Sequence, residues 1–333
     1  MRKRGLTVRK KGKVVLFFRA VGAILALMLV MCSVYLLIRG LDPFALLVES
    51  DRSVGAELPK IMEYKEANGL PLEIHFYEPL RKLFRRAPLI IYIHGGSWKH
   101  GSHVMGEDEM EVVGPFLEYG IAVASVQYRL TDEVNKFPDH INDVTDAIRF
   151  LYLNADELGV DRRRFCELGG SAGAHLALLA AHAQEVFGEE AALAGVEYKI
   201  KCVVALSTPC DFVDLSCYVG EDLTEVEELL EGFLGASFEV DPLIYEAASP
   251  VSYIDGGHRS IPVFMAHGER DTVVPIIQAD NYFAAARQVG MRVEYVRVLN
   301  AKHGLGSFDG GPTVPEKGEL LRRMVWFILR NVW

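Results

Sequence analysis

Short apolar runs alternate with segments of helical spacing from residue 72 onward, and this alternation limits the fold more than any other feature of the sequence. Buried strands separated by helices form mostly parallel sheets that helices cover on both faces. The strand candidates are Leu72–Tyr77, Leu89–His94, Ile121–Gln127, Phe165–Leu168, Ile200–Leu206, Ile261–Ala266 and Val293–Leu299. The helix candidates are Phe137–Leu153, Ala172–Ala183, Ile277–Val289 and Glu316–Leu329. The sequence therefore predicts one α/β domain, which we place at residues 61–333.

One stretch, Asp211–Ala248, interrupts the alternation between two strand candidates. It is acidic, and Asp222–Phe233 within it has helical spacing. Long insertions in α/β enzymes often serve as lids. We predict a cap over a functional site at residues 211–248, with a plain surface excursion as the alternative.

The first 39 residues carry nine Lys and Arg and no Asp or Glu. Within them, Ala20–Ile38 is a run of 19 residues without a charge, and Val14–Phe18 can lengthen it. Such a run nearly spans a hydrocarbon core of about 30 Å, and basic residues before a span keep that end in the cytoplasm. We expect a basic cytoplasmic tail (1–13), a single-pass signal anchor in the membrane (14–39), a linker (40–60) and an extracytoplasmic domain.

Two other interpretations of the N-terminal segment stay open. A cleaved signal peptide is disfavoured because no small-x-small site follows the apolar run, which exceeds the usual length of about 7–15 residues. A lipoprotein site at Cys32 is disfavoured because Met31 precedes it where a small residue is needed.

Composition beyond the N-terminal segment excludes two classes of protein. Residues 40–333 hold 26 basic and 45 acidic residues, a net charge of −19, so they repel phosphate backbones and no nucleic acid partner is expected. Five cysteines are too few for a disulfide scaffold. Cys166 and Cys202 are expected to be reduced core residues, whereas Cys210 and Cys217 could pair in an oxidising compartment.

The strongest local motif is Gly169-Gly170-Ser171-Ala172-Gly173, which lies between a strand candidate and a helix candidate. A nucleophile elbow requires this strand–turn–helix context and these small residues. The elbow holds the serine hydroxyl above the sheet, at a helix N-terminus that favours developing negative charge. The motif predicts Ser171 as a nucleophile; a Gly-rich turn capped by a serine is the alternative.

A second motif, His94-Gly95-Gly96-Ser97-Trp98, directly follows the strand candidate that ends at His94. Two glycines at this place let backbone N–H groups turn toward a common point. Together with the N–H of Ala172 they can form an oxyanion hole. The alternative is an ordinary turn at the end of a strand.

In enzymes with such an elbow, the catalytic acid comes after the serine in the sequence, and the catalytic histidine comes after the acid. Asp271 comes after the strand candidate Ile261–Ala266, and His303 comes after Val293–Leu299. Both therefore lie past the carboxyl ends of strands, where open α/β sheets place their sites. We expect His303 to take the proton of Ser171 and Asp271 to orient the imidazole. Either residue alone would be an ordinary capping or packing residue.

Together these motifs resemble the α/β-hydrolase esterases of the hormone-sensitive-lipase and kynurenine-formamidase-like branch, which includes BD-FAE-like bacterial carboxylesterases. The resemblance extends from about Leu70 to the end of the chain. It also rests on Tyr128-Arg129-Leu130, Phe137-Pro138 with Asp143 and Ala147, Ala248-Ser249-Pro250 and Gly268–Pro275.

The resemblance implies an α/β-hydrolase fold with Ser171 as nucleophile, Asp271 as acid and His303 as base. The implied oxyanion donors are the N–H groups of Gly96, Ser97 and Ala172, with Gly95 adjacent. The family branch also implies small acyl groups such as acetyl in the substrate.

Three positions depart from the family pattern. Ser97 stands where many lipase-like relatives have Gly, which indicates the branch with His-Gly-Gly-x-Trp. Ala174 follows Gly173 where a further Gly is common. Glu167 places a charge in the central strand, where it needs a partner or a water pocket.

Three histidines, His94, His100 and His103, lie close together in the sequence. Their glycine-rich loop, with no carboxylate before Glu107, favours solvent exposure or pocket lining over a metal site. The sequence contains no phosphate-loop or dinucleotide fingerprint. We expect neither a metal nor a cofactor, since triad chemistry needs neither.

The sequence therefore predicts a serine carboxylic-ester hydrolase that acts on a small-molecule ester through an acyl-enzyme. An arylformamidase or a small peptidase of the same fold is the closest alternative. A membrane-tethered, non-catalytic binding protein is the alternative of another class, and loss of a triad member would favour it. The natural substrate and the oligomeric state stay open.

Overall fold

The computed structural model of the protein describes residues 58–188, 190, 193–218, 221–254 and 261–332. The predicted cytoplasmic tail (1–13), the predicted anchor (14–39) and most of the predicted linker lie outside these ranges. Across the described ranges, none of the helices combines the length and the apolar character that a bilayer span requires.

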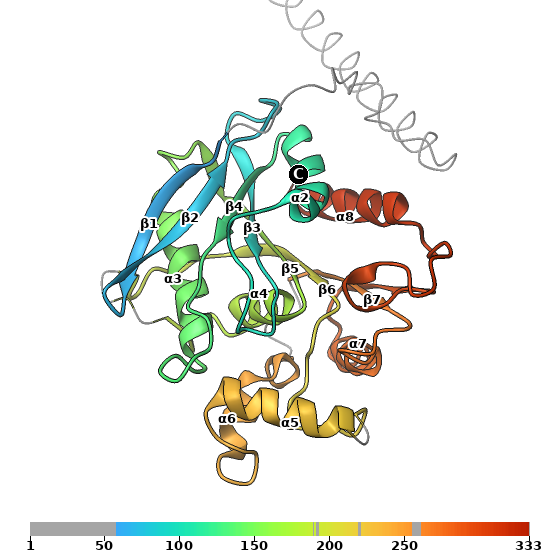
Figure 1. Ribbon diagram of the computed structural model, residues 1–333. Coiled ribbons are helices and arrows are strands. Elements are labelled where there is room, and N and C mark those ends of the chain that lie inside the picture. The colour runs from blue at the N-terminus through green and yellow to red at the C-terminus, as the bar shows by residue number, and fades with distance from the viewer. Residues whose placement is uncertain (1–57, 189, 191–192, 219–220, 255–260, 333) are drawn as a thin grey trace, which may run out of the picture. The chain divides into compact units, whose positions relative to one another are not determined.

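An eight-stranded sheet organises the described domain (Figure 1). Its strands are β1 (Lys60–Ala67), β2 (Leu70–Tyr77), β3 (Ala87–Ile93), β4 (Ala122–Val126), β5 (Val160–Gly170), β6 (Ile200–Leu206), β7 (Val263–Gly268) and β8 (Val293–Val298). Their order across the sheet is β1-β2-β4-β3-β5-β6-β7-β8. The β1/β2 and β2/β4 pairs are antiparallel, and the other pairs are parallel.

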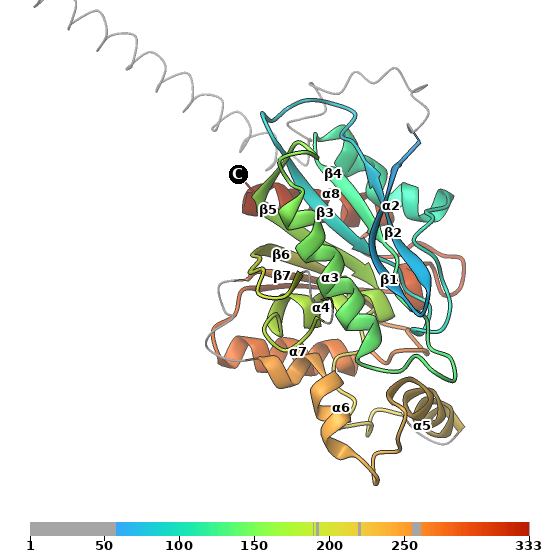
Figure 2. The same ribbon diagram turned by 90° about the vertical axis from the view of Figure 1, so that its left-hand side faces the viewer.

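Helices cover both faces of the sheet, as Figure 2 shows. On one face lie α3 (Asp139–Leu153), α4 (Ala172–His182) and α7 (Ile277–Gln288), whose apolar residues share one core with the inward side chains of the strands. On the other face lie α2 (Glu107–Glu118) and α8 (Lys317–Val332). The mostly parallel sheet with helices on both faces is the architecture that the alternation predicts.

The interruption at residues 211–248 contains α5 (Glu221–Leu234) and α6 (Pro242–Ala248), followed by the 3-10 turn η3 (Pro250–Tyr253). Both helices lie beyond one end of the sheet (Figures 1 and 2). The predicted helix Asp222–Phe233 matches α5 to within one residue at each end. A second 3-10 turn, η4 (His303–Leu305), follows β8.

Strand β1 and helix α2 were not among the sequence-based predictions, and neither was α6. Strand β1 begins at Lys60, in the last residue of the predicted linker, and its many charged residues suit a sheet edge more than a core. Helix α2 has Gly114 and Pro115 inside it and an acidic first turn, a pattern that hides its helical spacing. Both elements depend on tertiary contacts more than on local sequence.

A buried network of ion pairs ties β1 to α3. The ammonium of Lys65 lies 2.8 Å from Asp143 Oδ1 and 3.0 Å from Asp146 Oδ2, and all three side chains are almost fully buried. Arg129 contacts the second oxygen of Asp143 through its Nε at 2.8 Å. Burial by itself lowers the pKa of Lys65, but the two carboxylates outweigh burial and raise it.

Glu167 lies in β5 with no exposed surface, and neither of its carboxylate oxygens has a hydrogen-bond partner. Burial raises the pKa of Glu167 well above its ordinary value, because a charge without a partner is costly in the interior.

The four cysteines of the described domain are all free thiols. Cys166 and Cys202 are buried neighbours on β5 and β6, with 3.0 Å between their sulfur atoms, which agrees with their prediction as reduced core residues. Cys210 and Cys217 are not paired with one another.

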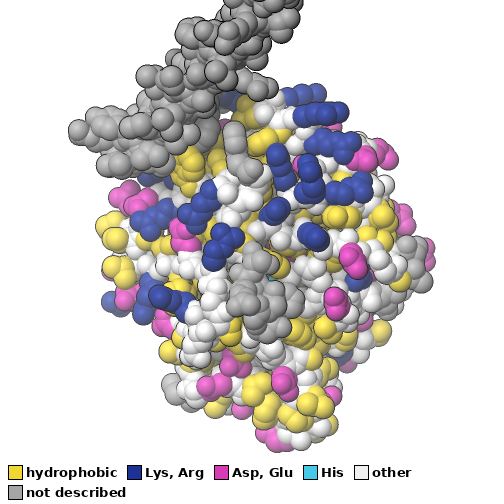
Figure 3. All heavy atoms as spheres, turned by 180° about the vertical axis from the view of Figure 1, so that it is seen from behind, with side chains coloured by type: hydrophobic (Ala, Val, Ile, Leu, Met, Phe, Trp, Pro, Cys, Tyr) yellow, Lys and Arg dark blue, Asp and Glu magenta, His cyan; other side chains and the backbone are white. Residues whose placement is uncertain are grey.

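Lys and Arg side chains gather on the upper half of the face that Figure 3 displays. A cleft of about 800 Å³ on the domain is lined by basic residues that precede or begin strands, among them Arg85, Arg86 and Arg162–Arg164. These residues lie at the amino ends of β3 and β5, opposite to the end at which the elbow sequence follows β5.

Candidate active site

Ser171 occupies a sharp turn between β5 and α4, with the unusual backbone angles φ 53° and ψ −123°. Its N–H donates to the carbonyl of Leu206 at 2.8 Å, and its own carbonyl accepts from the N–H of His175 at 3.1 Å. A non-glycine residue at positive φ is uncommon and persists only where neighbouring contacts hold it. The predicted elbow is therefore a strained turn that is fixed from both sides.

Two glycines allow the elbow to pack against the preceding strand and loop. A Cβ on Gly173 would lie 2.0 Å from the carbonyl oxygen of Ile93, and a Cβ on Gly95 would lie 2.7 Å from the carbonyl oxygen of Gly170. Only glycine permits backbones to approach this closely. The loop after β3 and the serine turn after β5 are thereby brought together.

The structure places the three predicted triad residues in one hydrogen-bonded series. His303 Nε2 lies 3.0 Å from Ser171 Oγ, and His303 Nδ1 lies 2.8 Å from Asp271 Oδ2. Asp271 is buried, whereas the His303 side chain is 25% exposed. The imidazole therefore links a sequestered carboxylate to a hydroxyl that solvent can reach.

Asp271 is held as a carboxylate by several donors. Its Oδ1 accepts from the N–H groups of Val273 at 3.0 Å and Val274 at 2.9 Å. His267 Nε2 lies 3.3 Å from Oδ2 and 2.7 Å from the carbonyl of Val274, to which it donates. Burial alone would raise the pKa of Asp271, but hydrogen bonds from His267 and His303 lower it far below the ordinary value.

The turn that carries His303 is fixed by Ser207, which the sequence did not indicate. Ser207 follows β6, is buried, and adopts a positive φ of 49°. Its hydroxyl accepts from the N–H of Gly304 at 3.3 Å, and its N–H donates to the carbonyl of Ala266 at 2.9 Å. This contact joins two loops about 100 residues apart, so no local pattern could reveal it.

The loop after β3 carries the predicted oxyanion donors Gly96 and Ser97, with Gly95 beside them. Gly96 and Ser97 have positive φ angles of 120° and 52°, and the carbonyl of Gly96 accepts from the N–H of His100 at 2.8 Å. The loop thus reverses direction tightly beside the serine turn. Ala172, the third predicted donor, is the first residue of α4.

Trp98 anchors this loop in an aromatic cluster. Its indole N–H donates to His175 Nδ1 at 3.1 Å, and its ring stacks on Phe233 of α5 with centroids 4.2 Å apart. His175 Nε2 lies 2.7 Å from the carbonyl of Ala248, so the protonated nitrogen is Nε2. Burial lowers the pKa of His175 to about 3, which keeps the ring neutral and this tautomer fixed. The loop, the helix behind Ser171 and the 211–248 insertion meet here.

The three neighbouring histidines of the sequence have different environments. His94 is buried and stacks on Tyr128, whose hydroxyl donates to the carbonyl of His94 at 2.9 Å. His100 is exposed. His103 is buried beside Glu73 and His75 of β2. The three do not form a common site.

A family model described as BD-FAE matches residues 74–285, which is more than half of the chain. The chain belongs to the BD-FAE family. The matched range includes the loop after β3, Ser171 and Asp271.

Relatives of this BD-FAE protein are named esterases. Esterase LipC of Mycobacterium tuberculosis is 31% identical over 232 residues, which cover 69% of this chain and 56% of LipC. Esterase LipQ of the same organism is 34% identical over 234 residues, which cover 69% of this chain and 52% of LipQ. The chain thus spans about half the length of these curated relatives.

Solved structures share the fold. A propionate-bound esterase, Est2, from Thermogutta terrifontis superposes with a TM-score of 0.65 at 24% identity, covering 82% of this chain and 94% of that one. A bifunctional GH43-CE protein of Bacteroides eggerthii gives a TM-score of 0.67 at 25% identity, covering 82% of this chain and 38% of that one. The domain of this BD-FAE protein therefore has the α/β-hydrolase fold.

Beside the loop after β3 of this BD-FAE protein lies a cleft of about 420 Å³. Three segments line the cleft: that loop, the segment after β4, and α5. The lining residues are Ser97 and Lys99; Thr131, Asp132, Glu133 and Lys136; and Glu228, Leu229, Gly232 and Phe233. The insertion at 211–248 therefore supplies one wall of the cleft. Charged residues of both signs line the cleft, namely Lys99, Asp132, Glu133, Lys136 and Glu228.

Proposed function

We propose that this BD-FAE protein is a serine hydrolase of small carboxylic esters in which Ser171, His303 and Asp271 form a catalytic triad. The observation that carries the proposal is the hydrogen-bonded series from Asp271 through His303 to Ser171, at 2.8 and 3.0 Å. A hydroxyl, an imidazole and a buried carboxylate in this series are the groups that activate a serine nucleophile.

The reaction follows from this geometry. Ser171 Oγ attacks the ester carbonyl while His303 Nε2 takes the hydroxyl proton, and the same proton then passes to the departing alcohol. Water, deprotonated by His303, attacks the acyl-enzyme, and the acid leaves as Ser171 regains its proton. Asp271 holds the imidazole by its Nδ1–H and stabilises the imidazolium that forms in each half-reaction.

The oxyanion of each tetrahedral intermediate is assigned to backbone N–H donors of Gly96, Ser97 and Ala172, with Gly95 packed beside them. The close approach of Gly95 to the serine turn supports this assignment. The N-terminus of α4 adds its positive partial charge at the same place.

The 211–248 insertion is proposed to act as a cap that shapes the substrate cleft. Its α5 supplies one wall of that cleft, and Phe233 packs against Trp98 of the oxyanion loop. The names of LipC and LipQ support ester hydrolysis.

We also propose that residues 14–39 anchor the protein in a membrane with residues 1–13 in the cytoplasm. The charge-free run and the basic residues before it support this placement. Extraction of membranes with alkaline carbonate should leave the full-length protein in the pellet. N-terminal sequencing that begins after residue 39 would instead establish cleavage.

The decisive experiment compares the full-length protein with its Ser171→Ala variant on 4-nitrophenyl acetate, butyrate and octanoate. We expect kcat/KM to fall by a factor on the order of 10⁴ or more in the variant, because the nucleophile is lost. Ser252→Ala, at an exposed serine outside the proposed cap, is the matched control and should keep the parent rate. The dependence of kcat/KM on acyl chain length indicates the size of the acyl-binding site.

Each other outcome contradicts the ester proposal in a specific way. Hydrolysis of aryl formamides or short peptides, but not esters, would identify a different hydrolase with the same triad. A folded parent that hydrolyses none of these compounds would identify a binding protein built on a hydrolase scaffold.

A further inference from the structure

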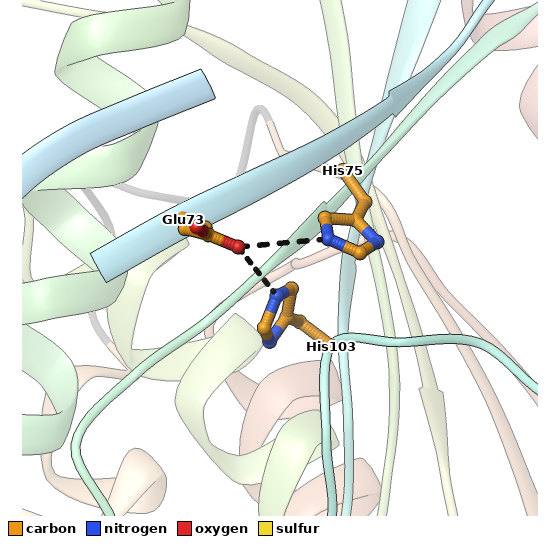
Figure 4. Close-up of side chains that lie close together, drawn as sticks. All are labelled: Glu73, His75 and His103. Atoms are coloured by element: carbon orange, nitrogen blue, oxygen red, sulfur yellow. Dashed lines mark ion pairs between the residues drawn. The ribbon is translucent and has the colours of Figure 1, made fainter. Parts of the chain in front are cut away.

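Three side chains outside the proposed triad meet on the face of the sheet that α2 covers. Glu73 and His75 come from β2, and His103 comes from the loop between β3 and α2, as Figure 4 shows. Both histidine Nε2 atoms point toward the same oxygen, Glu73 Oε2, at 3.8 Å from His75 and 3.7 Å from His103. The two rings lie edge to face, with centroids 4.4 Å apart.

These distances are too long for hydrogen bonds, which require about 2.7–3.2 Å between heavy atoms. His103 Nε2, which faces Glu73, is a buried atom without a hydrogen-bond partner; the unpartnered atom of His75 is Nδ1 and not the Nε2 that faces Glu73. Buried polar atoms without a partner are uncommon and call for a physical reason. Three polar groups that surround one point at ion-pair distance, without hydrogen bonds to one another, can share a further atom.

The environment favours ligands of a transition metal. His75 and His103 are only 7% and 8% exposed, while the Glu73 side chain is 38% exposed and opens the cluster to solvent. Burial and the neighbouring ring of His75 lower the pKa of His103, and Glu73 opposes this shift. Neutral imidazole nitrogen and a carboxylate oxygen are the form in which these groups bind metals.

We propose that Glu73, His75 and His103 bind a divalent transition metal of the zinc type. One potential ligand atom from each residue lies within 4.8 Å of the other two. Ligand atoms around tetrahedral zinc lie about 3.4 Å apart when each bond is about 2.1 Å. Closing the cluster onto the ion therefore needs side-chain rotations that shorten the distances between ligand atoms by up to about 1.4 Å. Two nitrogens and one carboxylate oxygen leave a fourth position for water.

Backbone contacts prepare the site on the β2 side. The N–H of Glu73 donates to Gln127 Oε1 at 3.0 Å, and the carbonyl of Glu73 accepts from the N–H of Gln127 at 2.9 Å. His75 pairs with Ser125 in the β2/β4 ladder. The backbone of both Glu73 and His75 is thus already fixed before the metal binds, so binding loses less conformational entropy.

The metal would fix the oxyanion loop to the sheet. His103 ends the segment that begins at Gly95, and within it a Cβ on Gly101 would lie 2.4 Å from the carbonyl oxygen of Gly95. The segment is folded back on itself, so holding His103 against β2 also holds the loop that faces Ser171. The metal has a structural role in this proposal and takes no part in the ester chemistry.

The test uses the full-length protein, stripped with a chelator and titrated with Zn²⁺ alone by calorimetry. We expect one ion to bind per chain with a dissociation constant on the order of 10 μM or lower. Binding should raise Tm by several degrees. His75→Ala and His103→Ala should weaken binding at least tenfold and remove the rise in Tm. His100→Ala, which changes the exposed neighbour, is the matched control and should bind as the parent does.

Two further measurements keep the test decisive. Glu73→Gln removes the charge from the partly exposed ligand without changing its size, so its loss of affinity cannot be assigned to misfolding. Co²⁺ in place of Zn²⁺ should give visible absorption bands that change in Glu73→Gln and not in His100→Ala. Ser171→Ala should bind Zn²⁺ unchanged, because the site does not depend on the proposed esterase activity.

Absence of stoichiometric binding to the parent would overturn the proposal. Binding that survives in His75→Ala, His103→Ala and Glu73→Gln alike would also overturn it, because the ion would then be held by other histidines of the chain.

Discussion

At the scale of single residues, the site depends on how Asp271 is held. Its two oxygens accept from two backbone N–H groups and from two imidazoles, so the carboxylate cannot rotate freely. This order keeps the proton of His303 on Nδ1 and leaves Nε2 free to accept from Ser171. In the mechanism that we propose, the direction of proton transfer is thus set by a residue that does not contact the substrate.

Replacing Asp271 by Asn should lower kcat by a factor of about 10³–10⁴ with little change in KM. The amide can present its N–H₂ group to His303 Nδ1, and the imidazole then carries its proton on Nε2, facing Ser171. Steady-state kinetics on 4-nitrophenyl acetate measures the effect. A loss that falls mainly on KM would show that Asp271 shapes the substrate site instead of the imidazole.

Asp271 should also contribute to stability against acid. Its folded-state pKa is lowered, so its contribution is complete above the unfolded value of about 3.9 and is lost as the pH falls below it. In urea unfolding, the free-energy gap between the parent and Asp271→Asn should therefore narrow between about pH 6 and pH 3. A gap that stays constant over this range would contradict the assignment.

The sequence predicted Ser171, Asp271 and His303 because each follows a strand in the chain order that a hydrolase elbow requires. Ser207 and His175 gave no such signal, since their partners Gly304 and Trp98 are about 80–100 residues away in the chain. Glu73 and His75 gave no such signal either, because they lie on β2, about 30 residues before His103 in the chain. Local pattern finds the reacting groups and overlooks the groups that position them.

At the scale of elements, the close packing of β3 against the start of α4 determines the position of Ser171. Gly173 lies directly against the backbone of Ile93, whereas Gly170, three residues earlier, would place a Cβ with no heavy atom within 4 Å. Gly173 is therefore required by close packing and Gly170 is not, although the two positions look alike in the sequence motif.

We expect Gly173→Ala to lower the free energy of unfolding by about 3 kcal/mol or more, because a methyl group 2.0 Å from the carbonyl oxygen of Ile93 forces α4 away from β3. Gly170→Ala is the matched control and should change it by less than about 1 kcal/mol. Chemical denaturation of the two variants gives both numbers. Equal losses would mean that the elbow adjusts to the added methyl group.

The edge strand β1 should depend on its buried ion pairs. Lys65→Met leaves Asp143 and Asp146 without their shared ammonium, and losing one partner of a buried pair costs about 3–5 kcal/mol. Lys60→Met, in the same strand, removes a pair with Glu157 whose side chains are 50% and 74% exposed, so its cost should be about 0–1 kcal/mol. Similar values for the two variants in denaturant melts would contradict a structural role for the network.

At the scale of the whole molecule, charge is distributed unevenly around the sheet. Basic residues line the cleft at the amino ends of β3 and β5. The sequence of α5, beside the cleft at the other end, contains six Asp and Glu and no Lys or Arg. The acidic excess of residues 40–333 therefore includes a concentration near the proposed site, and composition alone predicted the excess without predicting its place.

This asymmetry should disfavour esters that carry a negative charge. Acidic side chains of the cleft, such as Glu228 and Asp132, repel an anion on approach, and the repulsion extends over a screening length of about 30 Å at 0.01 M salt but only about 3 Å at 1 M. For an anionic aryl ester, kcat/KM should rise by about two- to tenfold between 0.02 and 0.5 M KCl, while the value for a neutral ester of equal size stays constant. Glu228→Gln should raise the low-salt value for the anionic ester alone. Salt acts on the same protein in both assays, so a parallel change in kcat/KM for the two esters would indicate an effect on the protein itself. If kcat/KM changes for neither ester, long-range charge does not contribute to specificity.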